Sequence, residues 1–310
     1  RARLKAPACR NFAAAAARKR FTRPVAMSSG TEERGWFGAV KDKVQKQTQD
    51  PLLVHPEAVG NVPAEPRQWC SFEYADSLEQ GLGPGLTSRF MEICADDTKE
   101  QRLLIHRTQN RNSFSLTTDH GLELLTAKLR NEGTRFDIYI AAQGGEKPLA
   151  LGPAFVLQGN KELTRWSLSS VRCDLCERLG KRKCGMRELA RMSHYIETVG
   201  EGQAFCLDLE TPRCRAVTCD VCGDSKAKFE MDLTTRRPKW NPKHKSLTLD
   251  FRGRCSLASA KNFQLEDPGD PQKCRFLFGK VGAHNFVLDF RAPLGPVQAF
   301  ATALTAMHWK

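Results

Sequence analysis

The sequence predicts a mainly β domain, an antiparallel sandwich or barrel, that encloses one hydrophobic helix. Short segments along the chain alternate apolar and polar residues, and turn clusters such as QGG, DPGDP and WNPKHK separate them. Such half-buried strands between turns are typical of antiparallel sheets. Near the end of the chain, the run LGPVQAFATALTAMHW is helix-forming and almost wholly apolar. No alternation of strands and helices indicates a doubly wound nucleotide-binding fold.

The β domain is predicted to span residues 67–310. Its strands are expected where every second residue is apolar, because successive side chains of a strand point to opposite faces. The clearest sets of alternating residues are Cys70, Phe72 and Tyr74; Phe136, Ile138 and Ile140; Phe229, Met231 and Leu233; Leu247, Leu249 and Phe251; and Phe286, Leu288 and Phe290.

The C-terminal run is predicted to be a buried helix. A helix without a polar face lies either inside a protein or inside a membrane, and this one is too short to span a bilayer. A barrel with the helix through its middle accommodates both the strands and the helix. The apolar residues that cover most faces of this helix are Leu294, Val297, Phe300, Ala301, Leu304 and Met307.

Residues 1–66 are predicted to form a tail, either disordered or carrying targeting or upstream sequence. Residues 1–26 are rich in Ala and Arg and contain no acidic residue. They match either an organelle-targeting peptide or sequence upstream of a start at Met27. A short amphipathic helix is predicted near residues 35–46, where apolar residues have helical spacing. The prolines that follow predict a linker.

The charge of the chain permits an anionic partner. The formal net charge is +13, and residues 1–30 contribute eight cations and no acidic residue. The remaining excess of positive charge suits phosphate, nucleic acid or an inner-leaflet lipid, and it does not choose among them.

Nothing in the sequence indicates catalysis. The seven histidines have no Ser, Cys or carboxylate partner at a spacing typical of a catalytic triad. The chain contains neither a P-loop nor a GxGxxG that follows a strand. We therefore expect a binding protein and not an enzyme.

Residues 240–305 resemble the tubby C-terminal domain over a long collinear pattern. The pattern comprises a Trp-Asn turn, the strand end FRGR, the segment ASAKNFQ, an FG-containing strand and PLGPVQAFATAL. LTAKLRNEGTRFDIY at residues 125–139 and LTRWSLSSVRCD at residues 163–174 are also similar to segments of this family. The resemblance implies a closed antiparallel barrel of about twelve strands around the C-terminal helix. Residues 173–228 are rich in cysteine and match the family poorly.

A candidate anion site lies in the segment Leu125–Arg130. If this segment is a strand, Lys128 and Arg130 stand side by side on its polar face. Such a pair can grip adjacent phosphates, with Arg bidentate and Lys a point charge. The resemblance to the tubby family implies that Lys128 and Arg130 contact phosphatidylinositol 4,5-bisphosphate. It further implies contacts from Arg165 and from Ser113, which stands where the family commonly has Asn.

Seven of the twelve cysteines lie between residues 173 and 222. Two pairs with a two-residue gap could place four thiolates around one structural zinc. The alternative is that these are buried free thiols of a reducing compartment, because a barrel of this size needs neither metal nor disulfides. No cofactor is required by either interpretation. The candidate zinc ligands are Cys173, Cys176, Cys219 and Cys222.

The leading hypothesis is a monomeric phosphoinositide-binding adaptor in the cytoplasm, peripheral at the plasma or ciliary membrane. It would link the membrane to a protein cargo or trafficking complex, and the resemblance implies ciliary trafficking as one use. The alternative is a nucleic-acid-associated transcription regulator that is released from the membrane into the nucleus. Single-strand binders interleave exposed aromatic residues with cations, whereas the aromatic residues here fall on inward strand positions, which favours lipid.

Overall fold

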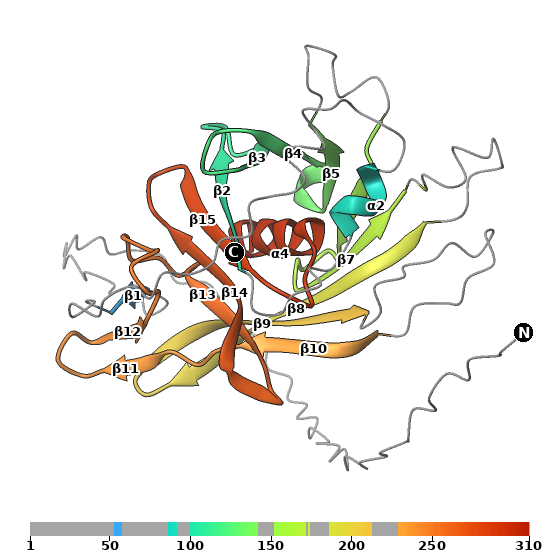
Figure 1. Ribbon diagram of the computed structural model, residues 1–310. Helices are drawn as coiled ribbons and strands as arrows, with labels where there is room; N and C mark the ends of the chain where they lie inside the picture. The colour runs from blue at the N-terminus through green and yellow to red at the C-terminus, as the bar shows by residue number, and fades with distance from the viewer. Residues whose placement is uncertain are drawn as a thin grey trace, which may run out of the picture. The chain divides into compact units, whose positions relative to one another are not determined.

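The computed structural model describes residues 53–57, 86–91, 100–141, 152–171, 173, 186–212 and 229–309. Most of these residues form a closed antiparallel barrel of twelve strands around one helix, as Figure 1 shows. The closed barrel and its central helix confirm the predicted fold. Because the barrel closes on itself, each of its strands has a hydrogen-bonded neighbour on both sides, and no strand edge is left open.

The barrel strands follow each other in chain order around most of the wall. Strands β2 to β10 are neighbours in chain order, as are β13 to β15, and the pairs β10–β13 and β15–β2 join these two runs into a closed barrel. The strands are β2 Gln101–Arg107, β3 Ser113–Thr117, β4 Glu123–Arg130, β5 Arg135–Ile140, β6 Phe155–Gly159, β7 Arg165–Ser170, β8 Arg187–Val199, β9 Gly202–Pro212, β10 Phe229–Thr235, β13 Phe263–Asp267, β14 Asp270–Lys280 and β15 Asn285–Phe290.

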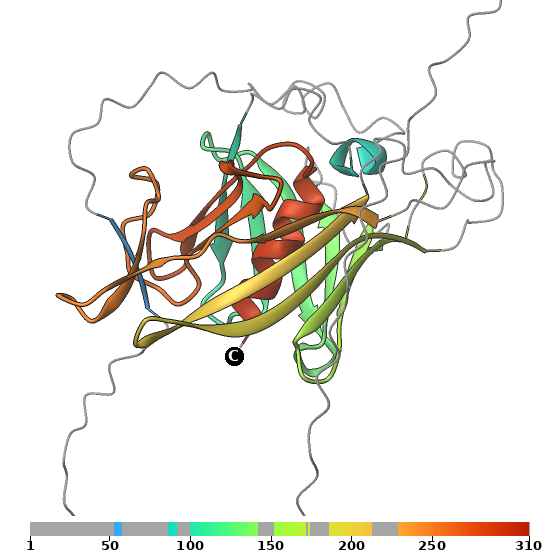
Figure 2. The ribbon, with the colours of Figure 1, turned by 90° about the horizontal axis from the view of Figure 1, so that it is seen from below.

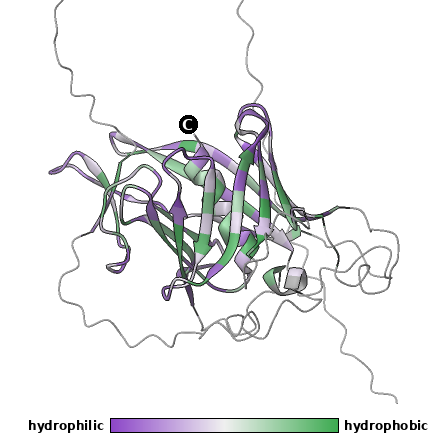
Figure 3. Cartoon of the chain, turned by 90° about the horizontal axis from the view of Figure 1, so that it is seen from above, coloured by the Kyte–Doolittle hydropathy of each residue, from purple (hydrophilic) through white to green (hydrophobic). Residues whose placement is uncertain are grey.

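The wall of the barrel keeps the two-residue period that the sequence shows. In β4, Leu125 and Ala127 are buried, whereas Lys128 is half-buried and Arg130 is exposed. Green and purple positions alternate along several strands in Figure 3. The alternation follows from the pleat of a strand, which sends successive side chains into the barrel and out toward solvent.

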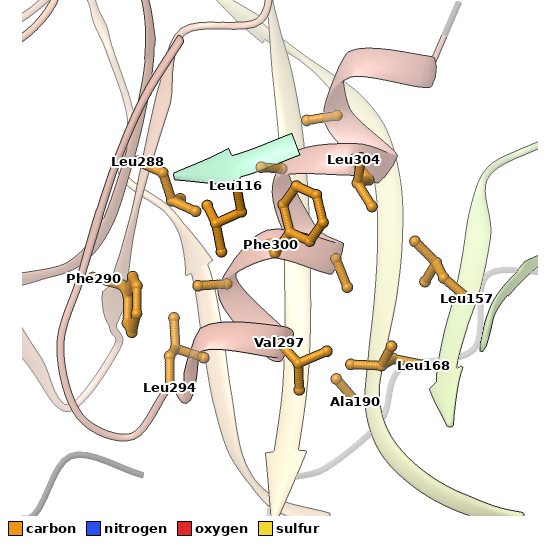
Figure 4. Close-up of a cluster of buried hydrophobic side chains, with 14 of the residues drawn as sticks. Leu116, Leu157, Leu168, Ala190, Leu288, Phe290, Leu294, Val297, Phe300 and Leu304 are labelled. Carbon is orange, nitrogen blue, oxygen red and sulfur yellow. The ribbon is translucent and has the colours of Figure 1, made fainter. Parts of the chain in front are cut away.

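Helix α4, Pro296–His308, fills the barrel interior. Every residue from Pro296 to Ala306 is buried, and Figure 2 shows the strands wrapped around this helix. Figure 4 shows Val297, Phe300 and Leu304 among side chains from several barrel strands. The helix therefore supplies the apolar volume that a barrel of this width needs.

The polar residues of α4 are satisfied by the helix itself. The Gly295 N–H donates to Oε1 of Gln298 at 3.1 Å, which occupies a donor at the start of the helix. The hydroxyl of Thr302 donates to the carbonyl of Gln298, and that of Thr305 donates to the carbonyl of Thr302, both at 2.8 Å. These bonds let three polar side chains lie in a dry interior without the cost of an unpaired polar group.

A short helix, α2 Leu86–Met91, closes one end of the barrel. Its residues Phe90 and Met91 belong to the same buried cluster as α4. Figure 2 places α2 at the end opposite the C-terminus of the chain. The other end, at the C-terminus of α4, is the one that carries the candidate site.

A second layer covers part of the outside of the barrel. It consists of β1 Val54–Pro56, β12 Ser246–Leu249 and β11 Lys239–Asn241, with β1 parallel to β12. The stretch that contains β1 was predicted to be a linker, and the structure corrects this for these residues. Val54 is buried in an apolar cluster with Leu247 and Leu249, and Pro56 is tolerated because β1 is an edge strand.

An ion pair holds the FRGR segment, residues 251–254, against the barrel. Arg254 donates from Nε and Nη2 to the two carboxylate oxygens of Asp289 at 2.8 and 2.6 Å. Asp289 is 1% exposed, so its charge has little access to water. The bidentate pair attaches the loop that follows β12 to the outer face of β15. Burial alone would lower the pKa of Arg254, and the hydrogen bonds to Asp289 raise it above its ordinary value.

Replacing Phe300 with Asp should prevent folding. An unpaired carboxylate in this interior costs several kcal/mol, which is a large part of the roughly 5–15 kcal/mol that stabilises a domain. The matched control is His244→Asp, which places the same carboxylate on an exposed turn. Circular dichroism melting should show a cooperative transition for His244→Asp and none for Phe300→Asp. A cooperatively melting Phe300→Asp protein would show that the helix is not internal.

Replacing Arg254 with Met should lower the free energy of unfolding by about 3–5 kcal/mol, because it leaves the Asp289 charge buried and unpaired. The double variant Arg254→Met with Asp289→Leu should recover much of this loss, since no lone charge remains. Urea unfolding of the three proteins measures both effects. Equal losses in the single and double variants would contradict a role for the charge pair.

His194 should make the protein less stable in mild acid. Its ring lies between Phe205 and Trp309, with centroids at 5.3 and 5.8 Å. Neither ring nitrogen has a hydrogen-bond partner among the described residues. Burial, with a smaller contribution from Lys261, lowers the pKa of His194 to about 3.

As the pH falls below about 6.5, the unfolded chain takes up a proton at this histidine and the folded chain does not. The contribution of His194 to the free energy of unfolding is therefore fully present above about pH 6.5 and is lost progressively as the pH falls toward 3. Between pH 7 and pH 5 this amounts to about 2 kcal/mol. Urea unfolding at both pH values should show a smaller loss for His194→Phe than for the unchanged chain. An identical loss in both proteins would sink this account.

Candidate anion-binding site

Three of the predicted site residues lie together on the outer face of β3 and β4. Ser113 is directly opposite Lys128 in the antiparallel register, and Arg130 follows two residues later. Their neighbours Phe114 and Ala127 point inward and are buried. The two strands therefore present a hydroxyl and two cations to the same outer surface, because these side chains share one phase of the pleat.

A carboxylate from β5 partly compensates these cations. Asp137 is opposite Lys128 in the register. Its oxygens lie 3.6 Å from Nε of Arg130 and 2.7 Å from Nε of Arg135. One carboxylate thus pairs with two arginines beside Lys128, so the three cations exceed this carboxylate by two charges. Lys128 also lies over the ring of Tyr139, with Nζ 5.9 Å from the centroid. Sequence reasoning missed Arg135 and Asp137, although their alternation in RFDIY signals an outward pair.

The turn after β4 fixes Arg130 relative to the central helix. The turn is a 3-10 segment, η1 Asn131–Gly133, in which Asn131 and Glu132 both have positive φ. Gly133 has φ 96°, and a Cβ there would lie 2.8 Å from Nε2 of His308 at the end of α4. Glycine is therefore required for both the backbone conformation and the close approach. Through this contact the barrel interior positions the outer cations.

Arg165, the fourth predicted contact, lies apart from the other three. It is the first residue of β7 and is exposed. Strands β5 and β6 separate it from β4. Neighbouring strands are about 4.8 Å apart, so three spacings place its backbone about 14 Å from β4. Arg165 instead borders a depression with Arg191, which forms ion pairs with Glu188 and Glu210.

Further cations lie around the mouth of the barrel at the same end. Arg107, Arg111, Lys261 and Lys280 line a cavity of about 430 Å³ beside the C-terminus of α4. Sequence reasoning did not assign any of these four residues to the candidate anion site. Their segments are far apart in the chain, and only the barrel register brings them together.

The predicted zinc ligands are mostly outside the described residues. Cys173 is a buried free thiol, and Cys176, Cys219 and Cys222 lie outside the part of the chain that the structure describes. Within that part, no group of three or more His, Cys, Asp or Glu side chains could hold a metal ion. A zinc site formed by the four cysteines stays a prediction.

No helix in the described ranges combines the length and the hydrophobicity that crossing a membrane would require. The short amphipathic helix predicted near residues 35–46 falls outside those ranges.

The chain is similar to known proteins in its C-terminal half. The sequence model of the Tub family matches residues 167–309. "Tubby protein homolog 1" of Caenorhabditis briggsae is 45% identical over 78 residues, which are 25% of this chain and 18% of that protein. "Tubby-related protein 1" of Homo sapiens is 42% identical over 80 residues, 26% of this chain and 15% of that protein.

"Protein king tubby" of Drosophila sechellia is 40% identical over 80 residues, 26% of this chain and 18% of that protein. The chain thus spans less than a fifth of the length of each of these relatives in the aligned segments. The family match begins within β7 and includes the whole of α4, the helix around which the twelve strands close. The family match over residues 167–309 and this architecture show that the chain is similar to the tubby family.

Proposed function

We propose that the barrel binds a phosphoinositide headgroup on the outer face of β3 and β4 and thereby acts as a peripheral membrane adaptor without catalysis. The observation that carries this proposal is the group Ser113, Lys128 and Arg130. These side chains share one surface, and among the described residues Asp137 is the carboxylate that pairs with Arg130 and with the neighbouring Arg135.

The group suits two neighbouring phosphates on one ring. Arg130 can donate two parallel hydrogen bonds to one phosphate, and Lys128 can approach a second as a compact charge. The Ser113 hydroxyl opposite Lys128 can donate to an oxygen of either. A bisphosphorylated headgroup such as that of phosphatidylinositol 4,5-bisphosphate uses all three residues, whereas a headgroup with one phosphate leaves one cation unused.

Arg165 supports this proposal in a different way. Its backbone lies about 14 Å from β4, and we assign it to the surrounding anionic leaflet. An exposed cation near such a surface contributes about 1 kcal/mol. The proposal places the protein in the cytoplasm at the plasma or ciliary membrane, as a monomer that links the membrane to a protein cargo. The similarity to the tubby family and the excess of positive charge support it.

Replacing Lys128 and Arg130 with Ala should weaken binding to vesicles containing phosphatidylinositol 4,5-bisphosphate by at least tenfold. Each charge-assisted contact to a phosphate contributes about 1.5–3 kcal/mol, and about 1.4 kcal/mol is a factor of ten. The melting temperature should hardly change, because both side chains lie on the outer face and leave no cavity. Vesicle flotation over a lipid titration measures the affinity.

The matched control is Lys243→Ala with Lys245→Ala, which removes the same charge from the exposed turn between β11 and β12. The control should bind vesicles like the unchanged chain. Equal weakening in both double variants would mean that attraction is diffuse and that no headgroup site exists. If neither variant weakens binding, the lipid proposal fails. Binding to single-stranded nucleic acid would then be measured, because the excess of positive charge suits it as well.

A further inference from the structure

Two of the cations that line the cavity at the barrel mouth lie on the inward-facing phase of their strands. In β2, Leu103 and Ile105 point into the barrel and are buried, and Arg107 is the next residue on the same inward phase. In β14, Phe276 and Phe278 point inward, and Lys280 follows on that phase. Charged residues are common on the outer face of a strand, where water solvates them. That reason does not apply to Arg107 and Lys280, because both lie on the inward phase.

The register places these two cations on either side of one strand. Strand β15 lies between β2 and β14, and its residue Phe286 is opposite both Ile105 and Lys280. Arg107 lies two residues beyond Ile105 along β2, so two strand spacings and this offset correspond to about 12 Å between the backbones of Arg107 and Lys280. The guanidinium of Arg107 lies over the ring of Phe286, and Lys280 lines the same cavity as Phe286. Such a separation fits a ligand with two anionic groups.

Backbone contacts hold the two arginines in place. Arg107 donates from Nη2 to the carbonyl of Ala283 at 3.1 Å, and its guanidinium lies 5.4 Å from the centroid of the Phe286 ring. Its Nε is buried without a hydrogen-bond partner among the described residues. Arg111 has φ 59°, which is uncommon for a residue other than glycine, and its N–H donates to the carbonyl of Thr108 at 2.9 Å. The turn thus holds Arg111 at the rim in a strained conformation.

Among the residues that the structure describes, no carboxylate compensates the cations of this cavity. Its described lining residues include neither Asp nor Glu. Lys261 donates to the carbonyl of Trp309 and so caps the C-terminal end of α4. Burial lowers the pKa of Arg107, and the nearby charge of Arg111 lowers it further. Two guanidinium groups that repel each other in a partly buried cavity are stabilised when an anion enters.

We propose that this mouth cavity is a second anion-binding site, which takes a small ligand carrying at least two phosphate groups through Arg107, Arg111 and Lys280. The site is separate from the outer face of β3 and β4. Lys128 and Arg130 point out of the barrel, whereas Phe114 and Leu129 of the same strands line the mouth cavity. A volume of about 430 Å³ accommodates a ligand of this size.

The apolar side of the cavity contributes to the choice of ligand. Phe286, Met307 and Trp309 also line the cavity, so a phosphorylated ring or short chain can contact apolar side chains while its phosphates meet the cations. The phosphates could belong to a soluble compound or to a lipid headgroup, and both share this chemistry. The two sources are separated by measuring a soluble phosphate and a vesicle with the same variants.

The first measurement uses inorganic pyrophosphate and the full chain in isothermal titration calorimetry. The mouth variant Arg107→Gln with Arg111→Gln should weaken pyrophosphate binding at least tenfold. The control variant Lys243→Gln with Lys245→Gln removes the same number of charges from the exposed turn between β11 and β12 and should leave it within twofold. The outer variant Lys128→Gln with Arg130→Gln should weaken it less than the mouth variant does. The single variant Arg111→Gln separates loss of binding from loss of folding, because Arg111 is exposed. It should weaken pyrophosphate binding at least threefold and leave the melting temperature unchanged.

A second measurement places the ligand in the cavity. Trp309 lines the cavity, so saturating pyrophosphate should change the tryptophan fluorescence of the chain. Trp309→Phe should remove this change while the calorimetric affinity stays within threefold. A fluorescence change that persists in Trp309→Phe would place the ligand elsewhere and would overturn the proposal.

Three further results would overturn a separate mouth site. The first is that pyrophosphate does not bind the full chain at millimolar concentration. The second is that the mouth and outer variants weaken pyrophosphate binding equally, which means one shared site. The third is that the mouth variant weakens only binding to vesicles containing phosphatidylinositol 4,5-bisphosphate, which assigns the cavity to the membrane headgroup. None of the three removes the vesicle binding that tests the outer face, so the two proposals fail independently.

Discussion

The filling of the barrel interior by α4 is the constraint on which the rest of the structure depends. A closed wall of twelve strands leaves a space that must be occupied by apolar atoms. Helix α4 fills it with Val297, Phe300 and Leu304, and it keeps Gln298 and Thr302 within its own hydrogen bonds. Because the helix has neighbours on all sides, each strand must direct its apolar phase inward. The outer phase is thereby free to carry charge.

The end of the same helix organises the candidate sites. The ring of His308 lies close to Gly133 in the turn that follows β4, the strand that carries Lys128 and Arg130. One residue further, the carbonyl of Trp309 accepts a hydrogen bond from Lys261 at the mouth cavity. The outer group and the mouth cavity are thus both positioned by the last turn of α4. The two sites nevertheless face different surroundings, since opposite phases of the pleat form them.

The sequence by itself determined the elements whose signal is local. Alternation in β4, β12 and β15 and the apolar run of α4 predicted the strands and the buried helix, because periodicity reports which face of an element is buried. Alternation also placed Lys128 and Arg130 on the polar face of one strand. Closure into twelve strands came from the family resemblance, since a two-residue period is the same in a sandwich and in a barrel.

Only the tertiary structure decided which distant segments meet. It placed Val54 in a sheet where the prolines had indicated a linker. An edge strand tolerates proline, and Val54 buries apolar surface of the cluster that includes Leu247 and Leu249. It separated Arg165 from the outer group and showed that Arg107 and Lys280 flank one strand. These relations depend on register and barrel order, which arise from pairing between segments far apart in the chain and leave no trace in local sequence.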